Sequence, residues 1–504
     1  MSKSGIKRYL LGFDLGSSSV KASLLNIETG TSAGSAQSPS SEMAIQSEQP
    51  GWAEQNPELW WEHICKSSNE LIKSTETDPN EIHAIGISYQ MHGLVVLDKN
   101  RNLLRPSIIW CDSRAAEIGQ KAFEELGTKF CLSNFLNSPG NFTASKLKWI
   151  KENEPETYQK IDKIMLPGDY AAFRMTGNIS TTMSGLSEGI LWNFQNDQIA
   201  TELINYYEFS PSLIPEIHPS FQHSGDLSDT AAKELGLKKG IPVTYRAGDQ
   251  PNNALSLNVL KSGELATTAG TSGVIYAVTD KPLFDPHSRV NSFVHVNHQT
   301  DRPSYGVLLC INGTGILNSW VKNQLTQNGG SYSQMNDLAA TVPIGSDGLL
   351  LYPFGNGSER ILKNKNPGSW FTGLNFNRHQ LSHLLRASQE GIVFSMNYGF
   401  DIMKEMGVKA NTVKAGLSNM FLSPVFREAF VNTTETELEL YQTDGAEGAA
   451  RGAGLGAGVF KEEKEAFSGL KKLEKLSPEK EKTELYQESY QKWLDKLNHN
   501  ILQE

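Results

Sequence analysis

Two stretches that lie far apart in the chain share one pattern of hydrophobic and polar positions. In residues 9–26 a hydrophobic run ends near an acid, Asp14, and a turn of glycine and serines at 16–19 leads into a second hydrophobic run. In residues 267–278 the same order returns around a turn at 270–273. Each stretch predicts a β-hairpin with a tight turn of small residues. Because the copies are too distant for a short-period solenoid, they predict a duplicated domain.

The two predicted turns have the composition of phosphate-binding loops. Glycine lets the backbone come close to a ligand, and hydroxyls and free N–H groups donate hydrogen bonds to it. Asp14, at the end of the first strand, is placed to bind a magnesium ion directly or through water. On the first stretch alone, an ordinary surface hairpin with a polar turn explains the pattern equally well.

Two further strand ends carry candidate chemistry. The run 82–88 leads into Gln90, Met91 and His92, at the kind of strand end where α/β folds bind ligands. A polar turn with a hydrogen-bonded histidine is the structural alternative. The run 241–245 is followed by Asp249, which opens a predicted helix. Asp249 is either a helix cap or the base that accepts a proton from the attacking hydroxyl in phosphoryl transfer.

Helix signals surround these strands. Asn56 with the proline after it predicts the start of a helix. Residues 181–189 are polar and predict a loop. The small-residue run 445–458 fits either a flexible linker or a helix that packs closely against a neighbour. Hydrophobic side chains spaced by four and three residues, beginning at Tyr486, predict an amphipathic helix at the C-terminal end.

Composition narrows the class of protein. A chain of 504 residues with 38% hydrophobic and 20% charged residues fits a globular protein of several domains. A net charge of -10 argues against a general nucleic-acid binder. The four cysteines have no spacing typical of a zinc or redox site, which favours a reducing, cytoplasmic location. No stretch approaches the ~20 apolar residues of a membrane span, so no membrane association is expected.

Taken together, the motifs resemble those of one family. The two turns, the sequence QMHG at 90–93, the I-x-W-x-D-x-R segment at 108–114 and the aspartate at 249 occur in the order typical of the FGGY carbohydrate kinases. Within that family the sequence QMHG is similar to the xylulokinases. The resemblance covers about residues 8–460. It implies two actin-like (ribonuclease H-like) α/β domains with a cleft between them, and it favours a packed helix at 445–458.

The resemblance also implies domain limits and a site. Residues 1–248 would bind the sugar and carry the first phosphate loop, residues 249–460 would bind the nucleotide, and residues 461–504 would form a helical extension packed on the second domain. Asp249 would be the catalytic base, and Asp14 and Asp249 would hold Mg²⁺. The sugar would contact Gln90, Met91, His92 and Asn252. ATP would contact Ser17, Ser18, Gly270, Thr271, Gly315, Gly416 and Asn419.

The implied reaction transfers the γ-phosphate of ATP to the terminal hydroxyl of a ketose, with D-xylulose as the first choice. Gln250 and Pro251 follow the aspartate where xylulokinases have asparagine and small residues, which leaves other ketoses or polyols open, such as sedoheptulose, ribulose or glycerol. A catalytically idle sugar-binding regulator and an actin-like polymer are alternatives from other classes. The expected partners are a sugar and ATP. The sequence leaves the oligomeric state open, with a homodimer as one candidate.

Overall fold

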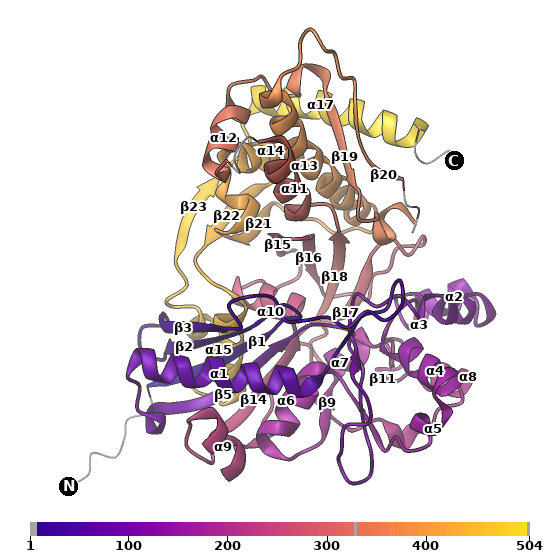
Figure 1. Cartoon of the computed structure of the whole chain (residues 1–504), viewed down its shortest axis with the longest axis vertical. Coiled ribbons are helices and arrows are strands. Elements are labelled where there is room, and N and C mark those ends of the chain that lie inside the picture. Colours follow the sequence, from indigo (N-terminus) through magenta and orange to yellow (C-terminus); the bar gives the residue numbers. More distant parts are fainter. Residues whose placement is uncertain (1–7, 327–329, 364, 366, 501–504) are drawn as a thin grey trace.

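The computed structural model describes residues 8–326, 330–363, 365 and 367–500. Figure 1 shows two lobes, each built on one large β-sheet with helices around it. The first half of the chain forms the lower lobe in this view, and most of the second half forms the upper lobe. The two sheets divide the chain in the way that a duplicated domain requires.

The first sheet has six strands. In spatial order they are β13 (Gly225–Asp226), β14 (Pro242–Gly248), β5 (Ile82–Tyr89), β1 (Tyr9–Leu15), β2 (Val20–Asn26) and β3 (Ser32–Ser38). Strands β1, β2 and β3 are antiparallel neighbours, whereas β5 and β14 run parallel to β1. The predicted first hairpin is therefore confirmed as β1–β2.

The second sheet has seven strands and repeats this plan. In spatial order they are β17 (Asn291–Val294), β18 (Tyr305–Ile311), β16 (Gly273–Thr279), β15 (Leu265–Ala269), β21 (Thr412–Gly416), β22 (Glu437–Tyr441) and β23 (Lys472–Leu476). Strands β15, β16 and β18 are antiparallel, and β21 and β22 run parallel to β15. Three antiparallel strands followed by two parallel ones thus occur in both halves, which confirms the predicted duplication.

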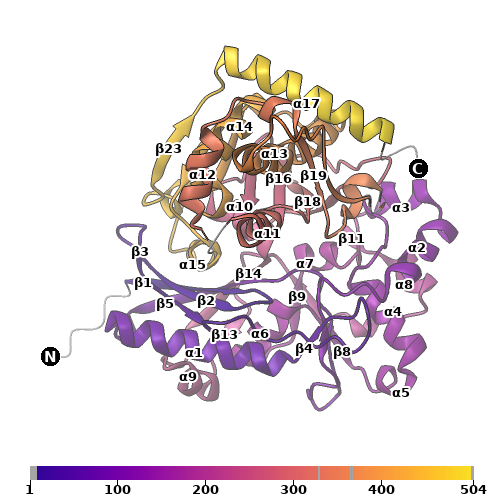
Figure 2. The ribbon, with the colours of Figure 1, turned by 45° about the horizontal axis from the view of Figure 1, so that its top comes forward.

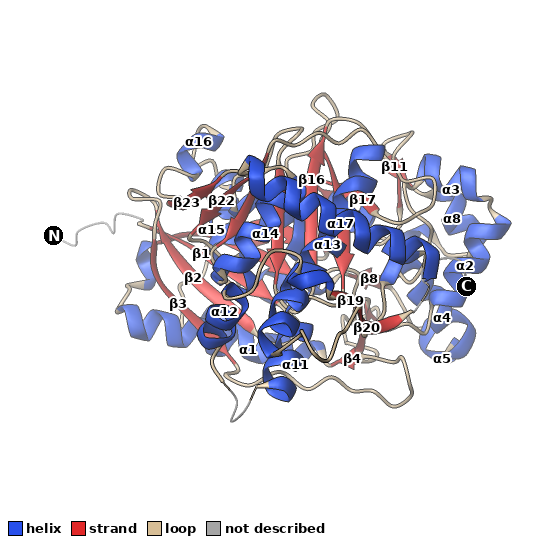
Figure 3. Cartoon of the chain, turned by 90° about the horizontal axis from the view of Figure 1, so that it is seen from above, coloured by secondary structure: helices blue, strands red, loops and turns tan. Residues whose placement is uncertain are grey.

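Long helices cover the two sheets. Helices α1 (Pro57–Thr75), α6 (Pro167–Thr176) and α9 (Asp229–Leu235) pack on the first lobe, and α13 (Leu381–Glu405), α14 (Pro424–Thr434) and α17 (Lys480–Asn500) on the second. Asn56 accepts a hydrogen bond from the backbone N–H of Glu58, so the predicted cap of α1 is confirmed. Figures 2 and 3 show α17 lying across the outside of α13 and α14.

One helix of the second half packs on the first sheet. Helix α15 (Gly445–Gly456) follows β22 in the chain but lies against β1, β5 and β14, on the face opposite α1. It also packs against α10 (Asp249–Ser256). Gly12 and Gly86 permit this approach, because a side-chain carbon at either position would strike the backbone of α15. The run 445–458 is therefore a packed helix rather than a linker.

Smaller elements complete the fold. The remaining helices include α2 (Ala116–Glu125), α3 (Thr128–Asn134), α4 (Thr143–Asn153), α5 (Pro155–Tyr158), α7 (Met183–Glu188), α8 (Thr201–Tyr206), α11 (Gly315–Leu325), α12 (Tyr332–Ala340) and α16 (Glu463–Ala466). Two-stranded sheets pair β4 (Glu54–Gln55) with β7 (Ser107–Ile108), β6 (Val95–Leu97) with β8 (Lys163–Met165), β9 (Ser180–Thr182) with β12 (Glu216–His218), β10 (Trp192–Asn193) with β11 (Gln198–Ile199), and β19 (Leu350–Phe354) with β20 (Gly368–Thr372). Within the described ranges no helix is long and apolar enough to cross a bilayer.

Two predictions of secondary structure were wrong. The predicted loop at 181–189 is instead the end of β9 followed by α7, because Thr182 caps the helix by accepting the backbone N–H of Gly185. The predicted helical extension after residue 460 contains a strand, β23, which extends the second sheet next to β22. The predicted C-terminal helix itself is present as α17, with Tyr486 and Trp493 fully buried.

Candidate active site

Three parallel strands of the first sheet bring the candidate chemistry to one edge. In the strand register Leu15 of β1, Tyr89 of β5 and Gly248 of β14 are direct neighbours. Asp14, the QMHG turn and Asp249 therefore lie side by side, although they come from three separate parts of the sequence. The carboxyl edge of parallel strands is where α/β sheets bind ligands, so this edge is the candidate active site.

Asp14 lies half-buried near the end of β1. Its Oδ1 accepts a hydrogen bond from Ser88 Oγ at 2.8 Å. Burial raises the pKa of Asp14, and the carboxylate of Asp444 raises it further, while the Ser88 hydrogen bond counteracts both. Gly445, the first residue of α15, approaches so closely that a side-chain carbon there would lie 2.6 Å from the Asp14 carboxyl carbon. The second half of the chain thus contacts this acid directly.

Asp249 is the first residue of α10 and is also half-buried. Burial and the nearby charge of Asp14 raise the pKa of Asp249 to about 7. A hydrogen bond from the backbone N–H of Gln250 acts in the opposite direction and lowers this pKa. The structure thus brings the two predicted metal ligands into electrostatic contact. A carboxyl group with a pKa near neutrality is well suited to accept a proton from a hydroxyl.

The predicted sugar loop is tightly held. The His92 ring donates from Nδ1 to the carbonyl of Glu188 at 2.9 Å, because a carbonyl can only accept. Burial and the nearby Lys146 lower the pKa of His92 to about 3, so the ring is neutral and its Nε2 is a free acceptor. Lys146 also donates to the His92 carbonyl at 2.9 Å. Gln90 donates to Gln55 Oε1 at 3.3 Å, while its own Oε1 is buried without a partner in the described part of the chain.

Asn252 links two helices rather than the sugar loop. Its Nδ2 donates to the carbonyl of Gly445 at 2.8 Å, so it ties α10 to the start of α15. Its Oδ1 is buried and has no hydrogen-bond partner among the residues that the structure describes. The predicted contact between Asn252 and a sugar stays a prediction.

The first phosphate turn is closed by its own backbone. Gly16 N donates to the Ser19 carbonyl at 3.0 Å. The Ser17 hydroxyl accepts from Trp110 Nε1 at 3.4 Å, and the Ser17 carbonyl accepts from Gln55 Nε2 at 2.7 Å. Ser18 is exposed at the tip. The turn therefore presents hydroxyl groups at the surface beside Asp14.

The second phosphate turn meets the start of a helix. Gly315 N, at the start of α11, donates to the Gly270 carbonyl at 2.7 Å, and Thr271 is exposed beside it. Asn419 Nδ2 lies 3.6 Å from where a side-chain carbon on Gly270 would be. The structure thus gathers these four predicted ATP-binding residues. Gly416 ends β21, and its carbonyl accepts from the backbone N–H of Ser418, the residue before Asn419, at 2.8 Å.

The acids fit a divalent cation. The charge of Asp14 raises the pKa of Asp249, and the charge of Asp444 raises the pKa of Asp14, so like-charge repulsion crowds this edge and a bound cation would relieve it. In the part of the chain that is described, no group of three or more His, Cys, Asp or Glu residues forms a complete metal cage. Two carboxylates with open positions suit Mg²⁺, which keeps water and phosphate ligands.

Sequence reasoning missed three acids near this site, namely Asp444, Glu447 and Glu188. Asp444 caps α15 by accepting the backbone N–H of Glu447 at 2.9 Å, and burial with the charge of Asp444 raises the pKa of Glu447 to about 7. An aspartate followed three residues later by glutamate resembles a capping box and was a usable signal. Glu188 lies within the segment predicted to be a loop, and its burial depends on the tertiary fold alone.

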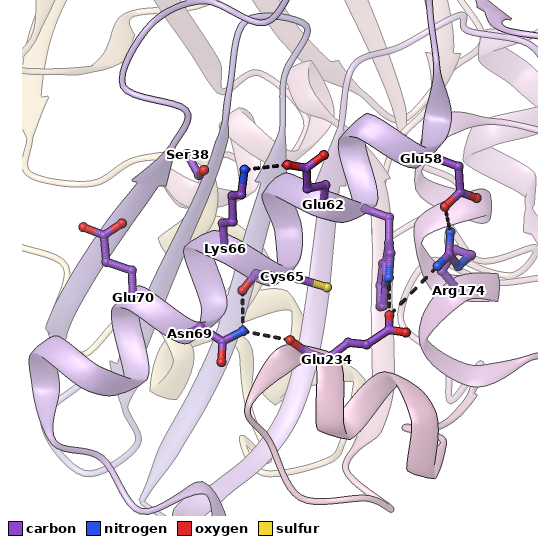
Figure 4. A pocket seen from close by; sticks show the side chains of 10 residues that line it. Ser38, Glu58, Glu62, Cys65, Lys66, Asn69, Glu70, Arg174 and Glu234 are labelled. Atoms are coloured by element: carbon purple, nitrogen blue, oxygen red, sulfur yellow. Dashed lines mark hydrogen bonds and ion pairs between the residues drawn. The ribbon is translucent and has the colours of Figure 1, made fainter.

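A separate groove lies away from these residues. It has a volume of about 870 Å³ and is lined by side chains of α1, α6 and α9 together with Ser38. Figure 4 shows Arg174 between Glu58 and Glu234 at one end of this groove, with Lys66 and Glu62 paired farther along α1. None of the predicted site residues lines this groove.

Comparisons with known proteins agree with this geometry. The N-terminal domain of the FGGY family of carbohydrate kinases matches residues 9–256, and the C-terminal domain of that family matches residues 265–459. A xylulose kinase of Bacillus subtilis is 30% identical over 456 residues, covering 90% of this chain and 89% of that protein.

Solved structures share the fold. A xylulose kinase from Rhodospirillum rubrum matches with a TM-score of 0.86 and 24% identity, covering 99% of this chain and 100% of that one. A gluconate kinase from Lactobacillus acidophilus matches with a TM-score of 0.87 and 23% identity, covering 97% of each chain. The predicted class of two actin-like (ribonuclease H-like) α/β domains is thereby confirmed. The chain belongs to the FGGY family of carbohydrate kinases and is an ATP-dependent sugar phosphotransferase.

Proposed function

We propose that this kinase phosphorylates the terminal hydroxyl of a ketose, and that D-xylulose, converted to D-xylulose 5-phosphate, is its preferred substrate. The proposal is carried by the alignment of Asp14, the QMHG turn and Asp249 at one sheet edge. The xylulose kinase of Bacillus subtilis, 30% identical to this chain, supports xylulose as the first choice. Because a gluconate kinase shares the fold, the identity of the sugar has to be tested directly.

In the proposed mechanism Asp249 accepts the proton of the attacking hydroxyl. With a pKa of about 7 it is substantially ionised at neutral pH, and its fixed position at the start of α10 orients the hydroxyl toward the phosphate. The neutral His92 ring supplies Nε2 as an acceptor for another sugar hydroxyl. Gln90, with its unbonded Oε1, can accept a second.

The two turns would hold the phosphates of ATP. Hydroxyls of Ser17 and Ser18 lie on the first turn. Gly270 and Thr271 lie beside the start of α11, whose first two backbone N–H groups already donate to their carbonyls, so the Thr271 hydroxyl and the positive end of the helix dipole would favour the anion there. Asp14 and Asp249 would hold Mg²⁺, which when bound neutralises charge on the transferring phosphoryl group.

A coupled assay of ADP release tests the proposal. Mg-ATP is offered with D-xylulose, D-ribulose, sedoheptulose, gluconate and glycerol, and D-xylulose is expected to give the highest kcat/KM. Asp249→Asn, which keeps the shape of the side chain, is expected to lower kcat by about 10²–10⁴, the usual loss for a general base. Faster turnover of another sugar would overturn the choice of D-xylulose. Wild-type activity in Asp249→Asn would overturn its role as the base.

A further inference from the structure

Glu188 is a buried acid at the junction between the sugar loop and the strand that leads to Asp249. It is the last residue of α7, and only 1% of it is exposed. Its backbone carbonyl accepts the hydrogen bond from His92. A side-chain carbon at Gly248 would lie 2.6 Å from both Glu188 Oε2 and Met91 Cγ. The carboxyl group therefore lies against the backbone immediately before the proposed catalytic base.

Neither carboxyl oxygen of Glu188 has a hydrogen-bond partner among the described residues. Glu390 of α13 is buried to the same 1% but is fully bonded. It accepts from Arg386 Nε at 2.7 Å, from Gly345 N at 3.0 Å and from Ser346 Oγ at 3.1 Å. A buried carboxyl without a partner is costly, so its presence in the candidate site indicates a ligand that completes it.

The surroundings of Glu188 set its chemical form. Burial, together with the charges of Asp249 and Asp169, raises the pKa of Glu188 well above its ordinary value. The Tyr89 hydroxyl lies near enough to counteract this, but it forms no hydrogen bond of standard geometry with the carboxyl group. In its neutral form the group can both donate and accept one hydrogen bond, which matches the bonding capacity of an alcohol.

We propose that Glu188 exchanges a hydrogen bond with a substrate hydroxyl close to the reacting end of the sugar, and that it is a specificity residue of this kinase. The inference rests on the proposed function, because it uses the same sugar site. It defines the substrate class more narrowly: a neutral polyhydroxy compound with a second hydroxyl beside the one that is phosphorylated. A substrate without that second hydroxyl leaves the carboxyl group unpaired, which is the strongest form of discrimination available to a polar site.

The test pairs protein variants with deoxy sugars. Wild type, Glu188→Met and Glu188→Ala are assayed with the preferred ketose and with its 3-deoxy and 4-deoxy analogues. For wild type, the 4-deoxy analogue, which lacks the hydroxyl next to the terminal one of D-xylulose, is expected to lose about tenfold to a hundredfold in kcat/KM, the loss of one buried hydrogen bond. Glu188→Ala is expected to show a similar loss on the parent sugar, mainly through KM, and little further loss on that analogue.

Two controls separate substrate contact from folding. Glu390→Gln removes a charge from an equally buried but bonded acid, and it is expected to lower the melting temperature while keeping wild-type discrimination. Tyr89→Phe removes the nearby hydroxyl and is also expected to keep that discrimination. Glu188→Met keeps a similar side-chain volume but removes the donor and the acceptor of the carboxyl group, so it carries the test where Glu188→Ala is poorly folded.

The outcomes distinguish this inference from the proposed function. Folded Glu188 variants that retain wild-type discrimination between the parent and both deoxy sugars would overturn the inference. Turnover of no sugar by wild type would instead count against the proposed function. In that case sugar binding is measured by calorimetry without ATP, and equal affinity of wild type and Glu188→Met for the tightest-binding sugar would overturn the role of Glu188.

Discussion

The two hairpins β1–β2 and β15–β16 have the same place in their sheets but different side chains at the equivalent position. Two residues before the turn glycine, the first hairpin has Asp14 and the second has Thr268. Across the strand pair, Asp14 faces Lys21, whereas Thr268 faces Val274. The first copy therefore carries charge, while the second offers hydroxyls and backbone N–H groups. Duplication supplied two similar turns, and only the first is preceded by an acid of the proposed metal site.

The helices that follow the last parallel strand of each sheet differ in the same way, in the acid at their start. Helix α10 follows β14 and begins with Asp249, and α15 follows β22 and begins with Gly445. The aspartate lies inside the first helix, whereas in the second helix Asp444 lies just before it and is used as a cap. We infer that catalytic charge is concentrated in the first half and that the second half supports it.

Substituting Asp249 and Asp444, the acids at the starts of α10 and α15, one at a time is expected to give the largest difference in kcat. Asp249→Asn should lower kcat by about 10²–10⁴, whereas Asp444→Asn should change kcat only severalfold, because asparagine is an equally good helix cap. Steady-state kinetics of both variants with the preferred sugar measure the difference. A loss of the same size in both would show that the two acids share one role.

Substitution of Asp14 and of Thr268 compares the contributions of the two hairpins to kcat. Asp14→Asn should lower kcat at least about a hundredfold, since a metal ligand supports several kcal/mol of transition-state charge stabilisation. Thr268→Val keeps the shape of the second hairpin and should retain activity within about threefold. Raising the Mg²⁺ concentration should partly restore Asp14→Asn and leave Thr268→Val unchanged. Equal activity losses in these two variants would contradict the asymmetry.

The pH dependence of kcat/KM should report the titration of Asp249, the proposed base in the first half of the chain. A base with a raised pKa is active when deprotonated, so kcat/KM should rise with pH and level off above about 7, the pKa of Asp249 in the free protein. Below that value activity should fall about tenfold per pH unit. The measurement is kcat/KM for the sugar between pH 5 and 9, values chosen to bracket about two units on each side of that pKa. An inflection near 3.8, the ordinary aspartate value, would contradict this assignment.

Crowding the contact between α15 and the first sheet should mainly affect stability. Gly86→Ala places a methyl group against the backbone of α15 at Ala449 and is expected to cost about 1–3 kcal/mol of unfolding free energy. Thermal and urea unfolding measure this cost, and residual kcat in the folded fraction should stay within about an order of magnitude of wild type. An unchanged unfolding midpoint would mean that α15 can move away from the sheet without cost.

Much of this architecture could be predicted because its signals are local. The hairpins follow from runs around glycine turns, the start of α1 from Asn56, and the start of α10 from the strand before Asp249. The run of small residues at 445–458 fits either a flexible linker or a packed helix, and only the family resemblance favours the helix, which the structure has as α15. In each of these cases neighbouring residues alone specify the backbone.

The rest depends on tertiary contacts that no local pattern encodes. The segment 181–189 is polar in sequence, yet α7 is almost completely buried because it packs under β17, so Ser184 and Ser187 bond to the backbone there. Glu188 is buried by the same packing. Strand β23 comes from a Lys- and Glu-rich segment whose charges form ion pairs with its neighbours β22 and α14, as Lys472 does with Glu439 and Glu474 with Arg427. Such positions are defined only once both lobes are assembled.

The placement of α15 on the first sheet has a consequence for synthesis of the chain. The hydrophobic face formed by Leu10, Ala84 and Tyr245 is complete in sequence once β14 has been made, but its cover ends at Gly456. At the usual pace of about 5–20 residues per second, a ribosome takes roughly 10–40 s to make the intervening chain. During that interval the first lobe exposes an unfinished core. A nascent chain of this kinase should therefore be a chaperone client until nearly its whole length has emerged.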